Sequence, residues 1–135
     1  MLSKEKIAKI KRVFDQYAEI KAVYLFGSRA AGTANQESDF DLACYSDNIP
    51  GRSVKLEILK DLTAEGFDNI DLVMLAKADP VIKYEAVRLN RLIYSTDDFD
   101  RGETYSKIIR EYLDLLPYLT VQRKAYKQKK LYAET

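Results

Sequence analysis

Apolar residues follow two different spacings along the chain, and these spacings predict its helices and strands. Between residues 3 and 17 the apolar positions recur at helical intervals, and Ser3 can cap the helix that this pattern predicts. Residues 21–26, 39–45 and 69–75 are short apolar segments of the kind that form strands. The segment 69–75 is almost continuously apolar, which predicts a central position in the sheet.

Helices are expected between these strands and after them. The apolar pattern of residues 54–66 predicts a helix that ends at the glycine. Asp79 followed by Pro80 predicts the start of another helix, which is expected to run to about Asn90. A short strand over residues 92–94 follows.

The last part of the chain predicts one long helix. Either Asp97 or Asp98 is expected to cap it, and Pro117 is expected to bend it. Its apolar positions form a broad stripe, which packs either on the chain's own sheet or on a partner. The stripe consists of Ile108, Ile109, Tyr112, Leu115, Leu116 and Leu119.

This order of elements predicts an α+β fold in which helices flank one small mixed sheet. We expect residues 1–96 to form the folded unit and residues 97–135 to add a C-terminal helical extension to the same domain. The sequence shows no internal repeat and no long linker that would divide it further.

Composition limits the chemistry. Apolar residues make up 47% of the chain and charged residues 32%, an ordinary balance for one compact domain. There is no histidine, and Cys44 is the one cysteine. These absences exclude an intrachain disulfide, a Cys/His zinc site and histidine-based catalysis. Any catalytic metal must therefore be held by oxygen ligands, which favours Mg²⁺, with Mn²⁺ as the alternative.

Charge is spread unevenly, although the net charge is only +1. Residues 101–135 hold 8 Lys+Arg against 4 Asp+Glu. This basic end fits a solvated or partner-facing helix better than direct nucleic-acid binding, because the whole chain is nearly neutral. No segment approaches the roughly 20 apolar residues of a membrane span, and the first residues of the sequence lack the continuous apolar stretch of a signal peptide. We therefore expect a cytoplasmic protein that does not enter the membrane.

Asp39 and Asp41 are the first residues that indicate a function. Side chains two apart in a strand point to the same face, so these carboxylates are expected to lie side by side. Two like charges this close repel each other unless a cation lies between them. A divalent metal is one interpretation, and an ordinary solvated strand face is the other.

Asp71 and the pair Gly27-Ser28 strengthen the metal interpretation. Asp71 lies in an apolar strand, where an ionised carboxylate is costly to bury unless it is paired or bound to metal. Alternatively, it is exposed at the start of that strand. Gly27-Ser28 ends the first strand, where glycine permits a sharp turn and a close approach of phosphate oxygens. Taken alone, a Gly-Ser pair is more often a simple turn.

The segment LFGSRAAGTANQESDFDL resembles the signature of the minimal nucleotidyltransferases, the MNT group of the DNA polymerase β-like superfamily. The shared features are Gly-Ser, ten further residues and Asp-x-Asp. The resemblance implies that Gly27 and Ser28 bind the triphosphate of ATP, and that Asp39, Asp41 and Asp71 hold two Mg²⁺ ions and carry the catalysis. Many members have an arginine at the position of Ala31, so Arg29 is the nearer candidate for a phosphate contact.

The same resemblance implies a partner. MNT proteins often pair with HEPN-domain toxins, and similar antitoxins transfer AMP from ATP to a tyrosine hydroxyl of the toxin. We therefore expect a homo- or hetero-oligomer in which a second chain supplies the acceptor. Two alternatives stay open: transfer of a nucleotide to a small molecule such as an antibiotic, and a catalytically silent module that neutralises a toxin by contact alone.

Overall fold

The computed structural model describes residues 3–27 and 40–133, with side chains described up to residue 119. Its helices and strands follow the predicted order. They are α1 (Lys4–Phe14), β1 (Ala22–Phe26), β2 (Phe40–Tyr45), α3 (Arg52–Ala64), β3 (Ile70–Met74), the short 3₁₀ helix η1 (Leu75–Lys77), α4 (Pro80–Val87), β4 (Leu92–Ser95) and α5 (Arg101–Ala133). Within these described ranges, no helix is both long and apolar enough to cross a lipid bilayer.

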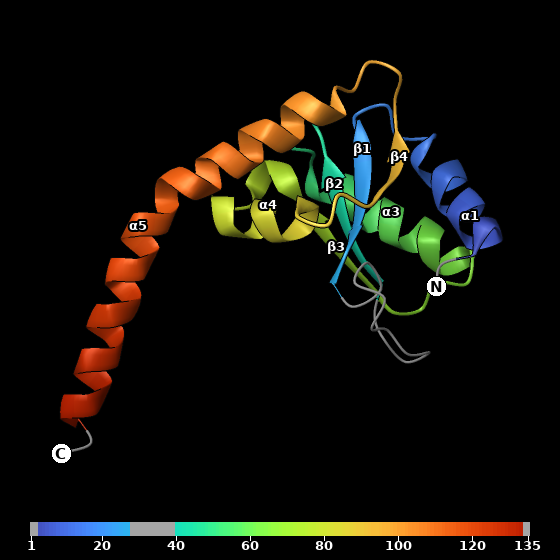
Figure 1. The fold of residues 1–135 in the computed structure, drawn as a ribbon. Coiled ribbons are helices and arrows are strands. Elements are labelled where there is room, and N and C mark those ends of the chain that lie inside the picture. The colour runs from blue at the N-terminus through green and yellow to red at the C-terminus, as the bar shows by residue number, and fades with distance from the viewer. Residues whose placement is uncertain (1–2, 28–39, 134–135) are drawn as a thin grey trace.

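The strands form one mixed sheet in the order β3-β2-β1-β4 (Figure 1). β1 runs antiparallel to both β2 and β4, whereas β2 and β3 are parallel. The predicted α+β fold with a small mixed sheet is therefore confirmed. The predicted central position of residues 69–75 is wrong, because β3 is one of the two edge strands among the described strands. Its residues are mostly apolar because other elements pack on both faces of the strand.

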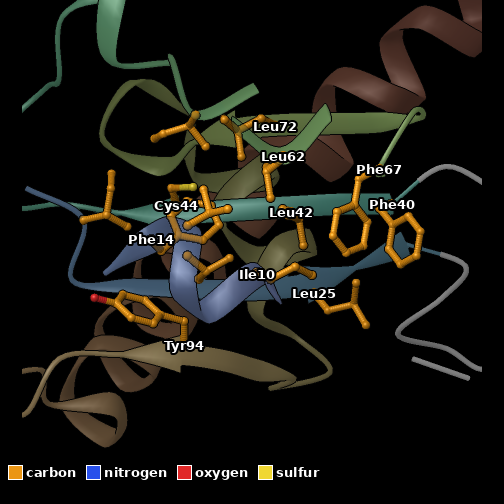
Figure 2. Close-up of a cluster of buried hydrophobic side chains, with 14 of the residues drawn as sticks. Ile10, Phe14, Leu25, Phe40, Leu42, Cys44, Leu62, Phe67, Leu72 and Tyr94 are labelled. Carbon is orange, nitrogen blue, oxygen red and sulfur yellow. The ribbon is translucent and has the colours of Figure 1, made fainter. Parts of the chain in front are cut away.

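The first face of the sheet packs on α1 and α3, and we call this layer the α1/α3 core. Figure 2 shows how side chains from both helices meet alternate residues of the strands. Phe40 and Phe67 pack edge to face, with ring centroids 5.4 Å apart. Cys44 is fully buried among these side chains, which raises the pKa of its thiol and makes it a structural residue.

The second face packs on α4 and the start of α5, and we call this layer the α4/α5 core. It contains Tyr24, Leu75, Val87 and Ile108 among its buried side chains. Alternation along the strands divides the two cores, since Leu42 belongs to the first and its neighbour Ala43 to the second.

Tyr24 leads to a prediction about stability. Its hydroxyl is buried and has no hydrogen-bond partner among the described residues, and burial raises the pKa of Tyr24 to about 12. A buried unsatisfied polar group costs about 1–3 kcal/mol, so Tyr24→Phe is expected to leave the free energy of unfolding unchanged or to increase it. Denaturant unfolding measures this.

Tyr17 provides the matched control for that substitution. Its hydroxyl donates a 2.5 Å hydrogen bond to Asp61. Tyr17→Phe is therefore expected to lower the free energy of unfolding by about 1 kcal/mol. A comparable loss for Tyr24→Phe would show that the Tyr24 hydroxyl has a partner in the folded protein.

Two predicted helix starts are confirmed by their hydrogen bonds. The Ser3 side chain accepts from the amide of Lys6 at 3.2 Å, and the Asp79 side chain accepts from the amide of Ile82 at 3.0 Å. The end of α4 comes earlier than the predicted Asn90. That residue instead has a positive φ of 53°, a left-handed conformation that cannot continue a helix.

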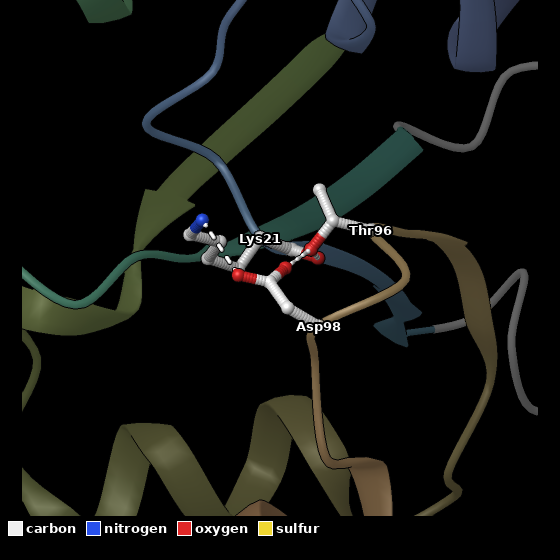
Figure 3. Close-up of polar contacts among 3 residues, drawn as sticks. All are labelled: Lys21, Thr96 and Asp98. Carbon is white, nitrogen blue, oxygen red and sulfur yellow. Dashed lines mark hydrogen bonds and ion pairs between the residues drawn. The ribbon is translucent and has the colours of Figure 1, made fainter.

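The predicted cap of the final helix is wrong, because neither Asp97 nor Asp98 fills that position. Asp100 does so, since its side chain accepts from the amide of Glu103 at 3.0 Å. Asp98 instead accepts from the Thr96 hydroxyl and forms a 3.1 Å ion pair with Lys21 (Figure 3). This ion pair holds the residue before β1 close to the turn after β4.

The same pairing predicts a pH-dependent effect on stability. Hydrogen bonds from Thr96 and Lys21 hold the pKa of Asp98 below its ordinary value of 3.8. A lowered folded-state pKa adds stability above the unfolded pKa, and this is lost as the pH falls through the folded pKa. We expect Asp98→Asn to lower the unfolding temperature slightly at pH 7, and we expect this effect to disappear as the pH falls through the lowered pKa of Asp98. Thermal unfolding from pH 2 to pH 7 checks this, and an equal effect at both ends would contradict it.

The helix α5 is 33 residues long and extends far beyond the rest of the protein (Figure 1). It changes direction partway along, and Pro117 lies inside it. Ile108 of the predicted stripe is buried, and the rings of Tyr84 and Tyr112 stack 3.8 Å apart. Further along, Leu116 is 36% exposed, so the stripe packs on the body mainly through its first part.

Candidate active site

Gly27 follows β1 and lies directly beside the carboxylate of Asp41. Its φ is 71°, a backbone conformation that residues with a Cβ rarely adopt. A Cβ built on Gly27 would lie 3.0 Å from Cγ of Asp41 and closer still to Oδ2. Glycine is therefore needed here for the turn and for the close approach of the carboxylate.

Asp41 and Asp71 are neighbours across the parallel strands β2 and β3. They are direct partners in the register of this pair, and Asp41 also pairs with Phe26 on β1. Paired strands lie about 4.8 Å apart. Both aspartates alternate with residues of the α1/α3 core, such as Leu72, and so belong to the opposite face of the sheet. The two carboxylates therefore stand side by side at one end of the sheet.

The exposure of Asp71 corrects one part of the sequence argument. Its apolar surroundings in the sequence suggested costly burial, but the side chain is exposed, while Asp41 is half-buried. Asp71 lies at the start of β3, and the strand register brings it beside Asp41. An exposed carboxylate next to a half-buried one is accessible to a solvated cation and to an incoming acceptor.

Three of the residues singled out from the sequence, Ser28, Arg29 and Asp39, lie outside the described residues. The structure thus brings together Gly27, Asp41 and Asp71. Among the residues whose side chains are described, no group of three or more acidic, cysteine or histidine residues is placed so that it could hold a metal ion. The chemistry of the donor set still fits Mg²⁺, because carboxylate oxygens are its preferred protein ligands.

A groove lies beside Asp71, along the outer edge of β3. We call it the β3 groove; its volume is about 570 Å³, within the range of ligand sites. β3 forms its floor, the helix α3 one wall, and the segment from η1 into α4 the other. Its lining includes Arg52, Lys55, Leu56, Asp71, Lys77 and Ile82.

Sequence reasoning missed the β3 groove. Its cationic residues come from two elements that are far apart in the sequence: Arg52 and Lys55 from α3, and Lys77 from η1. The strand order alone brings them to one edge of the sheet. A sequence signal existed on α3, because Leu56 does not share the helical face of Val54, Ile58 and Leu62, which are spaced by four residues. In the structure Leu56 is 66% exposed.

Comparison with known proteins gives a consistent result. The family model described as polymerase β nucleotidyltransferase matches residues 8–99. A protein named protein adenylyltransferase MntA, from Shewanella oneidensis, is 28% identical over 99 residues, which span 73% of this chain and 70% of the relative. The resemblance identified from the Gly-Ser and Asp-x-Asp residues is thereby confirmed.

Solved structures share the fold over almost the full length. The crystal structure of a toxin-antitoxin with AMP-PNP has a TM-score of 0.73 and 25% identity, and covers 93% of this chain and 98% of that chain. A second match is the MNT antitoxin in complex with a tri-AMPylated Shewanella oneidensis HEPN toxin, with a TM-score of 0.64 and 24% identity over 94% of each chain. At that identity the second match shows the fold.

Proposed function

We propose a specific reaction for this chain, which belongs to the polymerase β-type nucleotidyltransferase family. The reaction is the Mg²⁺-dependent transfer of AMP from ATP to a tyrosine hydroxyl of a HEPN-domain toxin, with this chain acting as antitoxin. The observation that carries the proposal is the juxtaposition of Gly27, Asp41 and Asp71 at one end of the sheet. The relative named as a protein adenylyltransferase supports AMP as the transferred group.

Each residue has a distinct role in this proposal. Gly27, followed by Ser28 and Arg29, offers backbone amides, a hydroxyl and a cation to the triphosphate. Asp41 and Asp71, with Asp39, would hold the Mg²⁺ ions. When bound, these ions lower the pKa of the attacking hydroxyl and offset the charge that builds on the leaving group.

In this proposal, Asp71 is the base that takes the proton of the acceptor hydroxyl. The acceptor oxygen forms a bond to the α-phosphorus while the bond from that phosphorus to the pyrophosphate oxygen breaks. The hydroxyl proton passes to a base, and the chain has no histidine for this task. Asp71 is exposed beside Asp41, so an acceptor hydroxyl can reach it from solvent.

The comparisons support a toxin as the partner. In the described part of the chain, α5 is the element that follows β4. The toxin-antitoxin crystal structure with AMP-PNP supports a toxin as the second chain. The exposed side chains of Leu113 (55%) and Tyr118 (68%) on α5 provide apolar surface for such a chain.

A labelling assay tests the proposal. We would incubate the protein with α-labelled ATP, Mg²⁺ and a HEPN toxin, and expect label on the toxin that is absent with EDTA. Substitution of the acceptor tyrosine, once mapped by mass spectrometry, should abolish the label. Tight binding without label would favour a silent binding module. Label on an added aminoglycoside in place of the toxin would favour a small-molecule enzyme.

A further inference from the structure

The β3 groove lies on the side of the site from which an acceptor must arrive. Gly27, Asp41 and Asp71 follow one another across β1, β2 and β3, and the groove begins beyond Asp71. In phosphoryl-type transfer the entering and leaving oxygens are roughly in line. If the triphosphate tail lies by Gly27, the acceptor enters from the opposite side, which is the groove.

The floor of the groove suits an extended peptide. Among the described strands, β3 has a neighbour on one side only, so its other edge faces the groove. Such an edge can pair with a partner segment in extended conformation, which main-chain hydrogen bonds hold in place. A nucleobase or a sugar has no comparable match to a strand edge.

The walls of the groove add charge and apolar surface. Arg52, Lys55 and Lys77 line it, and Asp71 is its one acidic lining residue among the described residues. Leu56 and Ile82 contribute apolar surface and are 66% and 44% exposed. Cationic side chains around an apolar floor complement a segment that carries acidic residues beside an aromatic one.

We propose that the β3 groove binds the acceptor segment of the toxin as an extended, acidic peptide and directs its tyrosine hydroxyl to Asp71. This inference rests on the proposed function and adds the site and chemistry of acceptor recognition. Lys55 and Lys77 are then specificity-determining residues that touch the acceptor's flanking side chains. They are exposed, so their substitution leaves the fold intact.

The test is a steady-state comparison of Lys55→Glu/Lys77→Glu with the wild type. We expect the KM for the toxin to rise roughly tenfold, with the KM for ATP unchanged within about twofold. The matched control is Lys4→Glu/Lys11→Glu, the same charge change at exposed positions of α1, which is expected to leave both KM values unchanged. A random copolymer of Glu and Tyr should compete with the toxin, whereas a copolymer of Lys and Tyr should not.

Three results would overturn the inference. The first is an unchanged KM for the toxin, and the second is a rise in the KM for ATP, which would make the groove a nucleotide site. The third is competition by a single-stranded RNA decamer that is as strong as the competition by the Glu/Tyr copolymer. This competition would also have to be lost in Lys55→Glu/Lys77→Glu.

Failure of the proposed function would look different, because the wild type would then label no toxin. In that case, fluorescence anisotropy with the Glu/Tyr copolymer still tests whether the groove binds an acidic peptide. Binding to the wild type that is lost in Lys55→Glu/Lys77→Glu supports the inference, and equal or absent binding to both overturns it.

Discussion

Asp41→Asn is expected to reduce transfer of label from ATP by roughly a thousandfold, because it removes one charge from the centre of the site. Asp41 lies between Gly27 and Asp71, at the centre of the described site residues. The change keeps the shape of the side chain, and the far-UV circular dichroism spectrum should stay the same. Initial rates at saturating ATP and Mg²⁺ measure the effect.

Asp47→Asn is the control for this substitution. It makes the same charge change at an exposed position just beyond the other end of β2. We expect its rate to equal that of the wild type. A variant Asp41→Asn that keeps more than about a tenth of the activity would show that this carboxylate is not part of the catalytic site.

Gly27→Ala is expected to lower activity about a hundredfold and to reduce the free energy of unfolding by about 1–3 kcal/mol. The backbone at φ 71° is unfavourable for alanine, and the added Cβ would overlap the carboxylate of Asp41. Either that side chain or the end of β1 must then move. Rates and denaturant unfolding measure the two effects separately.

Gly66→Ala is the control for this substitution, because it introduces backbone strain without displacing the carboxylate of Asp41. Gly66 has a φ of 100°, and a Cβ there would meet nothing within 4 Å. This variant should lose stability to backbone strain and keep its activity. If Gly27→Ala and Gly66→Ala lose activity equally, the loss at residue 27 reflects general destabilisation and not the position of Asp41.

Local signals in the sequence predicted the elements well. Ser3 and Asp79 begin helices through side-chain bonds to amides three residues on, so a few neighbouring residues contain all the information. The Gly-Ser and Asp-x-Asp residues identified the family for a similar reason. Their spacing is itself the family signature, so it can be identified within one short segment of the sequence.

Features that depend on distant residues were predicted less well. The edge position of β3 is set by strand order, and an apolar strand covered by helices on both faces looks central in sequence. Asp98 was expected to cap a helix because nothing in the local sequence shows its pairing with Lys21. The β3 groove was missed because it exists only once α3, β3 and α4 have come together. The roles of all the site residues stay predictions: Gly27, Ser28, Arg29, Asp39, Asp41 and Asp71.

The length of α5 has a consequence for the lifetime of the protein in the cell. At 1.5 Å per residue, its 33 residues extend for about 50 Å, and its second part leaves the folded body. A helix that lacks tertiary cover frays and opens readily, and open backbone is what proteases cleave. Under the proposed function, the free chain is therefore expected to be degraded from this end faster than the chain in complex with a toxin, so that its abundance follows that of the toxin.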